Sequence, residues 1–184
     1  ATPPYTCADA PPANAAMAAV IVPLLDAEQP GYSPPSIIEA GGVRQLIVWH
    51  PESINGLNPQ DGSVYWSLPL KPDYSMSIAI PCRRGNYLFA GGIGSVSALV
   101  KLDEKKPTAE IAWRSKKDAS VYPANSTPIV DSNGILYGVD CQGGQLRGVE
   151  FETGKRLWET FLPTTGNRRG AHGTAYIVRN GERY

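Results

Sequence analysis

Three hairpin-like segments carry a tryptophan at nearly regular intervals, and this spacing restricts the fold more than any other feature of the sequence. The segments are INGLNPQDGSVYWSLPL (54–70), VSALVKLDEKKPTAEIAWRS (96–115) and QLRGVEFETGKRLWETF (145–161). In the first and last of them the turn glycine, Gly62 or Gly154, precedes the tryptophan by four residues. Glycine supplies the positive φ of a tight turn, and β-branched or aromatic residues on both sides favour a hairpin. Trp66, Trp113 and Trp158 are 47 and 45 residues apart, which indicates a structural repeat of that length.

Each hairpin belongs to a run of four strand-like stretches. The expected strands are 36–39, 44–49, 53–57 and 63–68, then 77–80, 87–90, 96–102 and 109–113, then 127–130, 135–139, 145–151 and 155–161. A fourth unit begins with an expected strand at 173–178 and the turn Asn180-Gly181. The glycines of the first hairpin in each unit are Gly42, Gly85, Gly134 and Gly181, which are 43, 49 and 47 residues apart. This second series supports the repeat independently of the tryptophans.

A repeat of four antiparallel strands with this period is typical of a β-propeller blade. We therefore predict an all-β protein, a partial propeller arc of about three blades plus one strand. Residues 1–31 are a poorly patterned N-terminal segment, and 32–184 form the propeller domain. Its blades are expected at about 32–70, 71–115 and 120–162, with the start of a fourth at 170–184. Because an arc leaves strand edges and apolar faces exposed at its ends, we expect the missing blades to come from a longer chain or from self-association.

Composition agrees with this fold and excludes several classes of function. Nineteen glycines and seventeen prolines suit an all-β chain with many turns, and 17 basic residues balance 17 acidic ones, so nucleic acid is not an expected partner. The longest apolar run, 15–25, is interrupted by Pro23 and is too short to span a membrane. The three cysteines show no CxxC or Cys/His spacing, so we expect neither a zinc site nor a disulfide-dense scaffold.

The hairpins LNPQDGSVYWSLPL and VEFETGKRLWETF resemble the repeats of pyrroloquinoline quinone-like β-propellers, whose pattern is roughly L-D-x-x-T/D-G-x-x-x-W. That family includes quinoprotein alcohol dehydrogenases, a bacterial outer-membrane assembly scaffold lipoprotein and many uncharacterised repeat proteins. The chain is similar to a planctomycete-type bacterial group of the last kind, from Tyr32 to its C-terminus. The similarity runs through RQLIVWHPESINGLNPQDGSVYWSLPLKPDYSMSIA, ANSTPIV, YGVDCQGG and LWETFLPTTGNRRGAHGTA. The resemblance implies the fold, a longer natural chain and a periplasmic or otherwise extracytoplasmic location.

Polar residues recur just before each innermost strand, in the segments around Ser33, Ser75, Ser126 and His172. In a propeller these segments lead into the inner strands and are expected to converge on one rim of the central channel, where convergent polar groups form ligand sites. The ligand-binding candidates are Tyr74, Tyr122, Asn125, Arg168, Arg169 and His172. Each of these residue types also has a purely structural interpretation. Serines and asparagines at loop ends satisfy backbone groups, arginine doublets lie on surfaces, and a lone histidine donates a hydrogen bond.

The sequence favours binding over chemistry. It contains no GxSxG nucleophile motif, and the expected rim carries no pair of acids for glycoside hydrolysis. The periodic tryptophans, Trp66, Trp113 and Trp158, are expected to be core residues that pack against the neighbouring sheet. We therefore predict a non-catalytic scaffold or a surface that binds a protein or a small molecule, with no cofactor and no metal. The alternative is a domain of a quinoprotein-type oxidoreductase that uses pyrroloquinoline quinone with calcium, which the resemblance implies.

Overall fold

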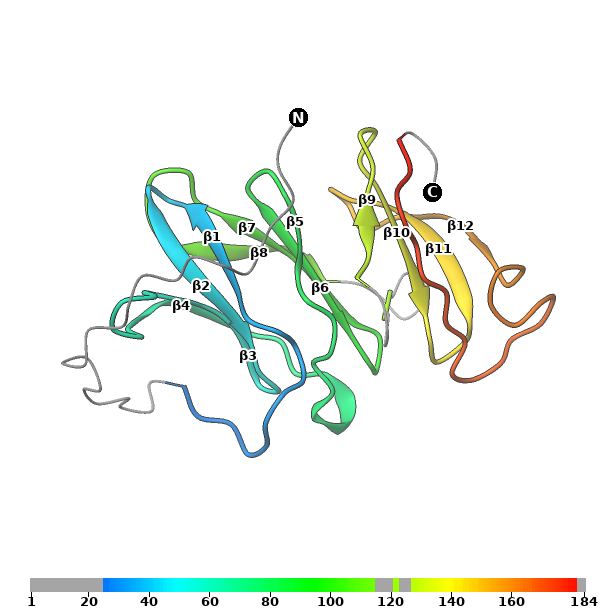
Figure 1. The fold of residues 1–184 in the computed structure, drawn as a ribbon, viewed down its shortest axis with the longest axis horizontal. Helices are drawn as coiled ribbons and strands as arrows, with labels where there is room; N and C mark the ends of the chain where they lie inside the picture. The colour runs from blue at the N-terminus through cyan, green and yellow to red at the C-terminus, as the bar shows by residue number, and fades with distance from the viewer. Residues whose placement is uncertain (1–24, 115–120, 123–126, 182–184) are drawn as a thin grey trace.

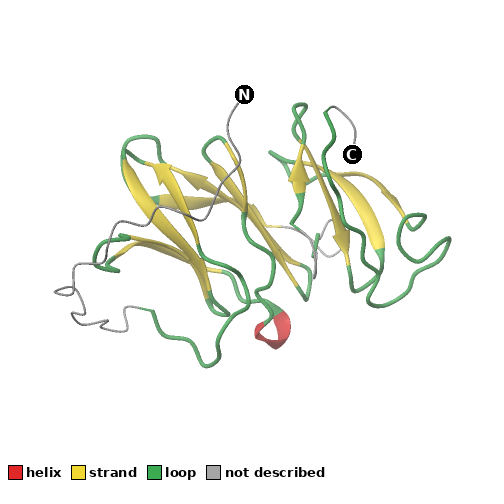
Figure 2. Cartoon of the chain, viewed as in Figure 1, coloured by secondary structure: helices red, strands yellow, loops and turns green. Residues whose placement is uncertain are grey.

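The computed structural model describes residues 25–114, 121–122 and 127–181, and its strands form three separate four-stranded sheets. The first contains β1 (Ser36–Ala40), β2 (Val43–Trp49), β3 (Ser53–Leu57) and β4 (Val64–Pro69). The second contains β5 (Cys82–Arg84), β6 (Tyr87–Gly92), β7 (Val96–Leu102) and β8 (Ala109–Arg114). The third contains β9 (Ile129–Val130), β10 (Ile135–Asp140), β11 (Gln145–Glu150) and β12 (Arg156–Thr160). A single 3-10 turn, η1 (Asp73–Ser75), is the helical element of the described residues (Figure 2).

Each sheet is an antiparallel meander in which strands that are consecutive in sequence are neighbours. The three sheets lie side by side in chain order (Figure 1). We call them blades 1, 2 and 3. The chain is therefore a partial β-propeller, and the prediction of the fold is confirmed. Within the described residues, no helix has the length and apolar character needed to cross a membrane.

Two apolar clusters join the blades. The first contains buried residues of blades 1 and 2, including Ile47 and Trp49 from β2 and Leu88 from β6. The second lies between blades 2 and 3 and includes Phe89 and Phe151. In β2 the buried residues alternate with less buried ones, which is the pattern of a strand that covers a core with one face.

The same irregularity occurs in all three blades. Between the third and fourth strands the pairing register shifts after Gly56, after Leu99 and after Gly148. Each of these residues lies directly opposite the repeated tryptophan: Trp66, Trp113 or Trp158. The shift therefore defines structurally equivalent positions in the three blades. At Gly56 the close approach of the tryptophan ring explains the glycine, because a Cβ atom there would lie 2.2 Å from the indole nitrogen of Trp66.

The repeated tryptophans are not buried alike. Trp66 is 6% exposed within the first cluster, and the indole of Trp113 donates a hydrogen bond of 2.9 Å to the carbonyl of Phe151 in the next blade. Trp158, in contrast, is 40% exposed, so the prediction that it is a core residue is wrong. Its equivalents are covered by the following blade, and none of the three sheets follows blade 3.

Two expected strands are absent from the sheets. Residues 77–80 form no strand, and β5 begins only at Cys82, after Pro81. The carbonyl groups of Ser77 and Ala79 instead accept hydrogen bonds from the backbone of Tyr32 (2.9 Å) and the hydroxyl of Ser33 (3.1 Å). Proline interrupts a hydrogen-bonded ladder because it has no backbone N–H.

Residues 173–178 also belong to none of the three sheets, so the prediction of a strand there is wrong. The first strand of a blade is held by the second strand of the same blade. The described residues contain no second strand beside 173–178.

The thiol of Cys82 packs against the cluster between blades 2 and 3. Burial raises the pKa of this thiol to about 11, and a backbone hydrogen bond at Val130 lowers the pKa by a smaller amount. The thiolate is the reactive form, so a rise from 9.0 to about 11 lowers its population about 100-fold below pH 9. We expect Cys82 to react with a disulfide reagent about 100 times more slowly than an unperturbed thiol, and the rate to rise tenfold per pH unit until the pH approaches 11.

The reaction is measured in a variant that keeps Cys82 as its one cysteine (Cys7→Ser, Cys141→Ala). The same variant in concentrated urea is the control and should react at the ordinary rate. A native rate equal to the unfolded rate would contradict the burial of this thiol.

Candidate functional site

Several loops meet at one edge of blades 2 and 3, the lower edge in Figure 1. The backbone N–H of Asp73 in η1 donates to the carbonyl of Ile93, and the N–H of Gly94 donates to the side-chain oxygen of Gln142, at 3.2 and 3.0 Å. The N–H of Gly170 donates to the carbonyl of Gly143 at 3.1 Å. These bonds connect η1, the β6–β7 turn, the β10–β11 turn and the loop after β12 into one rim.

A cavity of about 760 Å³ opens at this rim, between the β6–β7 turn of blade 2 and strands β11 and β12 of blade 3. We call it the rim pocket. Its polar side chains are Ser95, Asp140, Gln142, Gln145, Arg147, Arg156, Glu159 and Arg169. The volume lies in the range of pockets that bind small molecules or short peptide segments. A second cavity, of about 620 Å³, lies near the β1–β2 turn and carries Glu39, Arg44 and Glu104.

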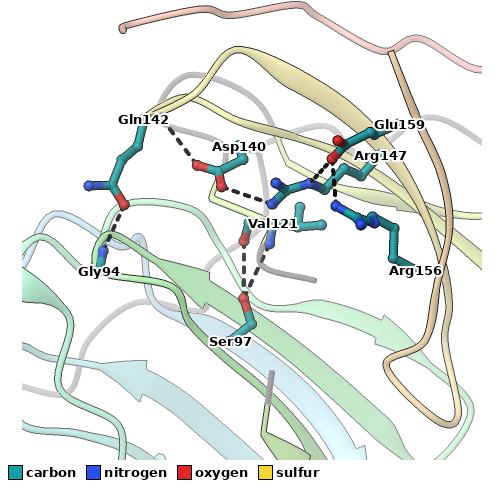
Figure 3. A network of polar contacts seen from close by, with 8 residues as sticks. All are labelled: Gly94, Ser97, Val121, Asp140, Gln142, Arg147, Arg156 and Glu159. Carbon is teal, nitrogen blue, oxygen red and sulfur yellow. Dashed lines mark hydrogen bonds and ion pairs between the residues drawn. The ribbon is translucent and has the colours of Figure 1, made fainter. Parts of the chain in front are cut away.

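Arg147 is the centre of the ionic network in the rim pocket (Figure 3). It is 4% exposed, and its guanidinium contacts Asp140 Oδ2 at 2.9 Å and Glu159 Oε2 at 3.2 Å. Arg147 and Glu159 are direct partners across β11 and β12, so the register of the hairpin brings the two charges together. Arg156 reaches the same oxygen of Glu159 at 2.8 Å.

The charges of the pocket do not cancel. Three arginines, Arg147, Arg156 and Arg169, face two carboxylates, which leaves one positive charge in excess. Both carboxylates are already paired with Arg147 or Arg156. The excess charge is therefore on Arg169, which is exposed at the mouth of the pocket.

Two glutamines give the pocket further hydrogen-bonding groups. Gln142 is exposed, and because its Oε1 atom binds the N–H of Gly94, its amide nitrogen is directed elsewhere as a donor. The Oε1 atom of Gln145 is buried and has no hydrogen-bond partner among the described residues. This atom has almost no accessible surface, so the exposed amide of Gln142 is the group of the two that a ligand in the pocket reaches.

The six residues singled out in the sequence have different positions. Arg169 lines the rim pocket, whereas the neighbouring Arg168 is exposed outside its lining and uses its backbone carbonyl to accept a hydrogen bond from Thr165. Tyr74 is 78% exposed in η1, and His172 is exposed beyond the lining; both have positive φ, 56° and 60°.

Tyr122 is only 2% exposed, and its hydroxyl lies 3.9 Å from the sulfur of Met76. Burial raises the pKa of Tyr122 to about 12, and the nearby Cys141 adds to the rise. Its backbone pairs with Asp140, so it supports the rim from inside. Asn125 lies outside the described residues.

Sequence reasoning missed the ionic core of the pocket. Arg147 and Glu159 lie inside predicted strands, and Asp140 directly follows the strand predicted at 135–139, so the pattern indicates only a hairpin there. A usable signal existed, because the turn at Gly154 sets a register that places Arg147 opposite Glu159. The turn at Gly154 gives no information on Asp140, because the contact of Asp140 with Arg147 depends on how β10 pairs with β11.

The equivalent positions of the other blades hold different residues. The register gives the sets His50, Asn55 and Ser67 in blade 1, Gly92, Ala98 and Arg114 in blade 2, and Asp140, Arg147 and Glu159 in blade 3. The tryptophans recur in every blade, but these three positions do not. Blade packing therefore does not require the charged set of blade 3.

The blade 1 set includes a histidine that contacts a serine, but the geometry of this pair does not suit nucleophilic catalysis. His50 Nδ1 accepts a hydrogen bond from the N–H of Glu52, so the proton of the neutral ring is on Nε2, which lies 3.1 Å from the hydroxyl of Ser53. Burial lowers the pKa of His50, while Glu52 and Asp26 raise it. In this arrangement His50 donates to Ser53, whereas a general base would have to accept its proton.

The described residues were also tested against the quinone and calcium of the alternative function. They contain no group of three histidine, cysteine, aspartate or glutamate residues that could hold a metal ion. In the rim pocket both carboxylates are paired with arginine, and the exposed Trp158 lies on the end face of blade 3, outside the pocket lining. This part of the chain therefore does not fit a calcium ion beside a stacked quinone.

Comparison with known proteins finds similar structures but no similar sequences. No model of a protein family matches the chain, and no curated protein sequence matches it. Among solved structures, the crystal structure of BamB from Moraxella catarrhalis is similar to 69% of this chain, with 14% sequence identity and a TM-score of 0.46. The matched part is 35% of the BamB chain, so this chain spans about a third of that protein. The propeller architecture follows from the three blades of the chain itself.

Proposed function

We propose that this chain is a non-catalytic binding module, a propeller arc that holds a ligand or a protein segment in the rim pocket. The observation that carries the proposal is the charged set Asp140, Arg147 and Glu159, which lines a cavity of ligand size and has no counterpart in the other two blades. A repeat whose copies differ at polar positions that line a cavity is expected to carry its function there.

The chemistry of the pocket also supports binding. Asp140 and Glu159 each accept hydrogen bonds from arginine, and these bonds fix the carboxylates in place. Fixed ion pairs and amide groups give a preorganised surface, which lowers the entropy cost of recognition. No step through a quinone is proposed, since the described residues do not fit one. An extracytoplasmic location remains the expectation of the family resemblance.

A random peptide library displayed on phage tests the proposal even though the partner is unidentified. The library is selected on the wild-type protein, and each recovered peptide is then measured on Gln142→Trp, which places a large ring at the mouth of the pocket. The matched control is Gln60→Trp, which adds the same ring at an exposed position of the β3–β4 turn in blade 1. We expect enriched peptides that bind the wild type and Gln60→Trp equally and lose at least about tenfold in affinity on Gln142→Trp. Peptides that bind all three proteins alike, or a library without enrichment, would refute the proposal.

A further inference from the structure

On the basis of this proposed function, we further propose that the occupant of the rim pocket is an acidic peptide segment. In this arrangement Arg169 binds a carboxylate of the peptide, and the amide nitrogen of Gln142 donates to one of its backbone carbonyl groups. The structure supports each of these two contacts separately.

The carboxylate site rests on the charge of Arg169. The other two arginines of the pocket are held by Asp140 and Glu159, with contacts of 2.8 to 3.2 Å. Arg169 supplies the excess positive charge of the cavity, and a guanidinium binds a carboxylate through two parallel hydrogen bonds. The partner must therefore bring a negative charge.

The position of Arg169 is fixed by its neighbours. The carbonyl of Arg168 accepts a hydrogen bond from Thr165 at 2.6 Å, and the N–H of Gly170 donates to Gly143 in the β10–β11 turn at 3.1 Å. The backbone is thus held immediately before and after Arg169, which keeps this residue at the mouth of the pocket. A backbone that is already fixed removes the loop-ordering part of the entropy cost of binding an anion.

The requirement for a peptide group rests on Gln142. Its Oε1 atom accepts a hydrogen bond from the N–H of Gly94 at 3.0 Å, which fixes the orientation of the side-chain amide. The exposed amide nitrogen of Gln142 is placed to donate to a peptide carbonyl.

The charge of the pocket is too small for an extended polyanion. Nucleic-acid and membrane surfaces are bound by stripes of several lysines and arginines, and the rim pocket has an excess of one positive charge. One carboxylate with adjacent peptide groups matches this charge and the volume of about 760 Å³.

The experiment uses a fluorescein-labelled peptide, Ser-Gly-Asp-Glu-Gly-Ser, and its neutral counterpart, Ser-Gly-Asn-Gln-Gly-Ser, in fluorescence anisotropy titrations at low ionic strength. The proteins are the whole 184-residue chain, its Arg169→Gln variant and the adjacent Arg168→Gln variant. Both variants remove one exposed positive charge from the same loop, and only one of them alters the pocket. Circular dichroism confirms that both are folded.

We expect the acidic peptide to bind at least about tenfold more tightly than the neutral one, and Arg169→Gln to abolish that preference while Arg168→Gln keeps it. Unlabelled glutamate serves as a competitor and should displace the peptide only at a much higher concentration, because it lacks the neighbouring peptide groups. Equal binding of the two peptides, equal losses in the two variants, or displacement by glutamate as effective as by unlabelled peptide would each overturn the inference.

The two proposals fail in distinguishable ways. If neutral library peptides bind in a manner that depends on Gln142 and not on Arg169, the binding function stands and the acidic partner is wrong. If no library peptide depends on Gln142, the binding function itself is wrong.

Discussion

Replacement of Arg147 by methionine is expected to lower the free energy of unfolding by about 3–5 kcal/mol. Arg147 is 4% exposed and pairs with both Asp140 and Glu159, so its removal leaves the buried carboxylate of Asp140 without these ionic contacts. Methionine fills much of the same volume, which separates the loss of charge from the creation of a cavity. The measurement is equilibrium unfolding in urea, monitored by circular dichroism.

Arg156→Met is the matched control. Arg156 shares the same carboxylate of Glu159, but about a third of each side chain is exposed, so water screens the pair and the expected loss is about 1 kcal/mol or less. The double variant Arg147→Met, Asp140→Asn should recover part of the stability lost in Arg147→Met, because asparagine keeps an acceptor for the N–H of Gln142 and removes the buried charge that Arg147 balanced. Equal losses for the two arginine variants would contradict a buried ionic centre.

Trp66→Ala is expected to cost a similar amount, about 3–5 kcal/mol. The ring lies in the apolar cluster between blades 1 and 2, and its indole N–H donates to the buried Oε1 atom of Gln45 at 2.7 Å. Alanine therefore leaves both a cavity and an acceptor that has lost its donor. Unfolding in urea measures the loss, and the near-ultraviolet circular dichroism of the native state reports whether the packing survives.

Trp158→Ala tests the same position at the end of the arc. Because Trp158 is 40% exposed, we expect a loss of about 1–2 kcal/mol, smaller than that for Trp66→Ala. Equal losses would mean that another sheet covers the end face of blade 3 in solution. Analytical ultracentrifugation would then show the self-association that we expect of an arc whose missing blades are not supplied by the same chain.

Much of the fold follows from local rules that can be read in the sequence. The third strands, β3 and β7, have the predicted bounds, and the hairpins turn at the predicted glycines, such as Gly134 with a φ of 81°. Two expected strands failed because a strand exists only with a hydrogen-bonded neighbour in its own sheet. Residues 77–80 instead bind the segment that precedes β1, and residues 173–178 belong to none of the described sheets.

The candidate site was less predictable, because its residues come from segments whose approach is set by pairing between strands and between blades. The rim loops were expected to converge, and Arg169 was among the predicted residues, but the side chain of Tyr122 is buried and the ionic centre was not foreseen. A carboxylate such as Asp140 has no distinguishing pattern in the sequence. Its contact with Arg147 appears only when β10 and β11 pair.

The sequence by itself determined the blade, since turn glycines, alternating apolar residues and the tryptophan after each hairpin act over a few residues. Only the tertiary structure decided which copies of the repeated pattern are buried to the same extent. Trp66 and Trp158 occupy the same place in their blades, but one is covered by the next blade and the other is partly exposed at the end of the arc. The rim pocket has the same origin. Its charges are local to blade 3, and its walls exist because blade 2 packs beside it through the apolar cluster between the two sheets.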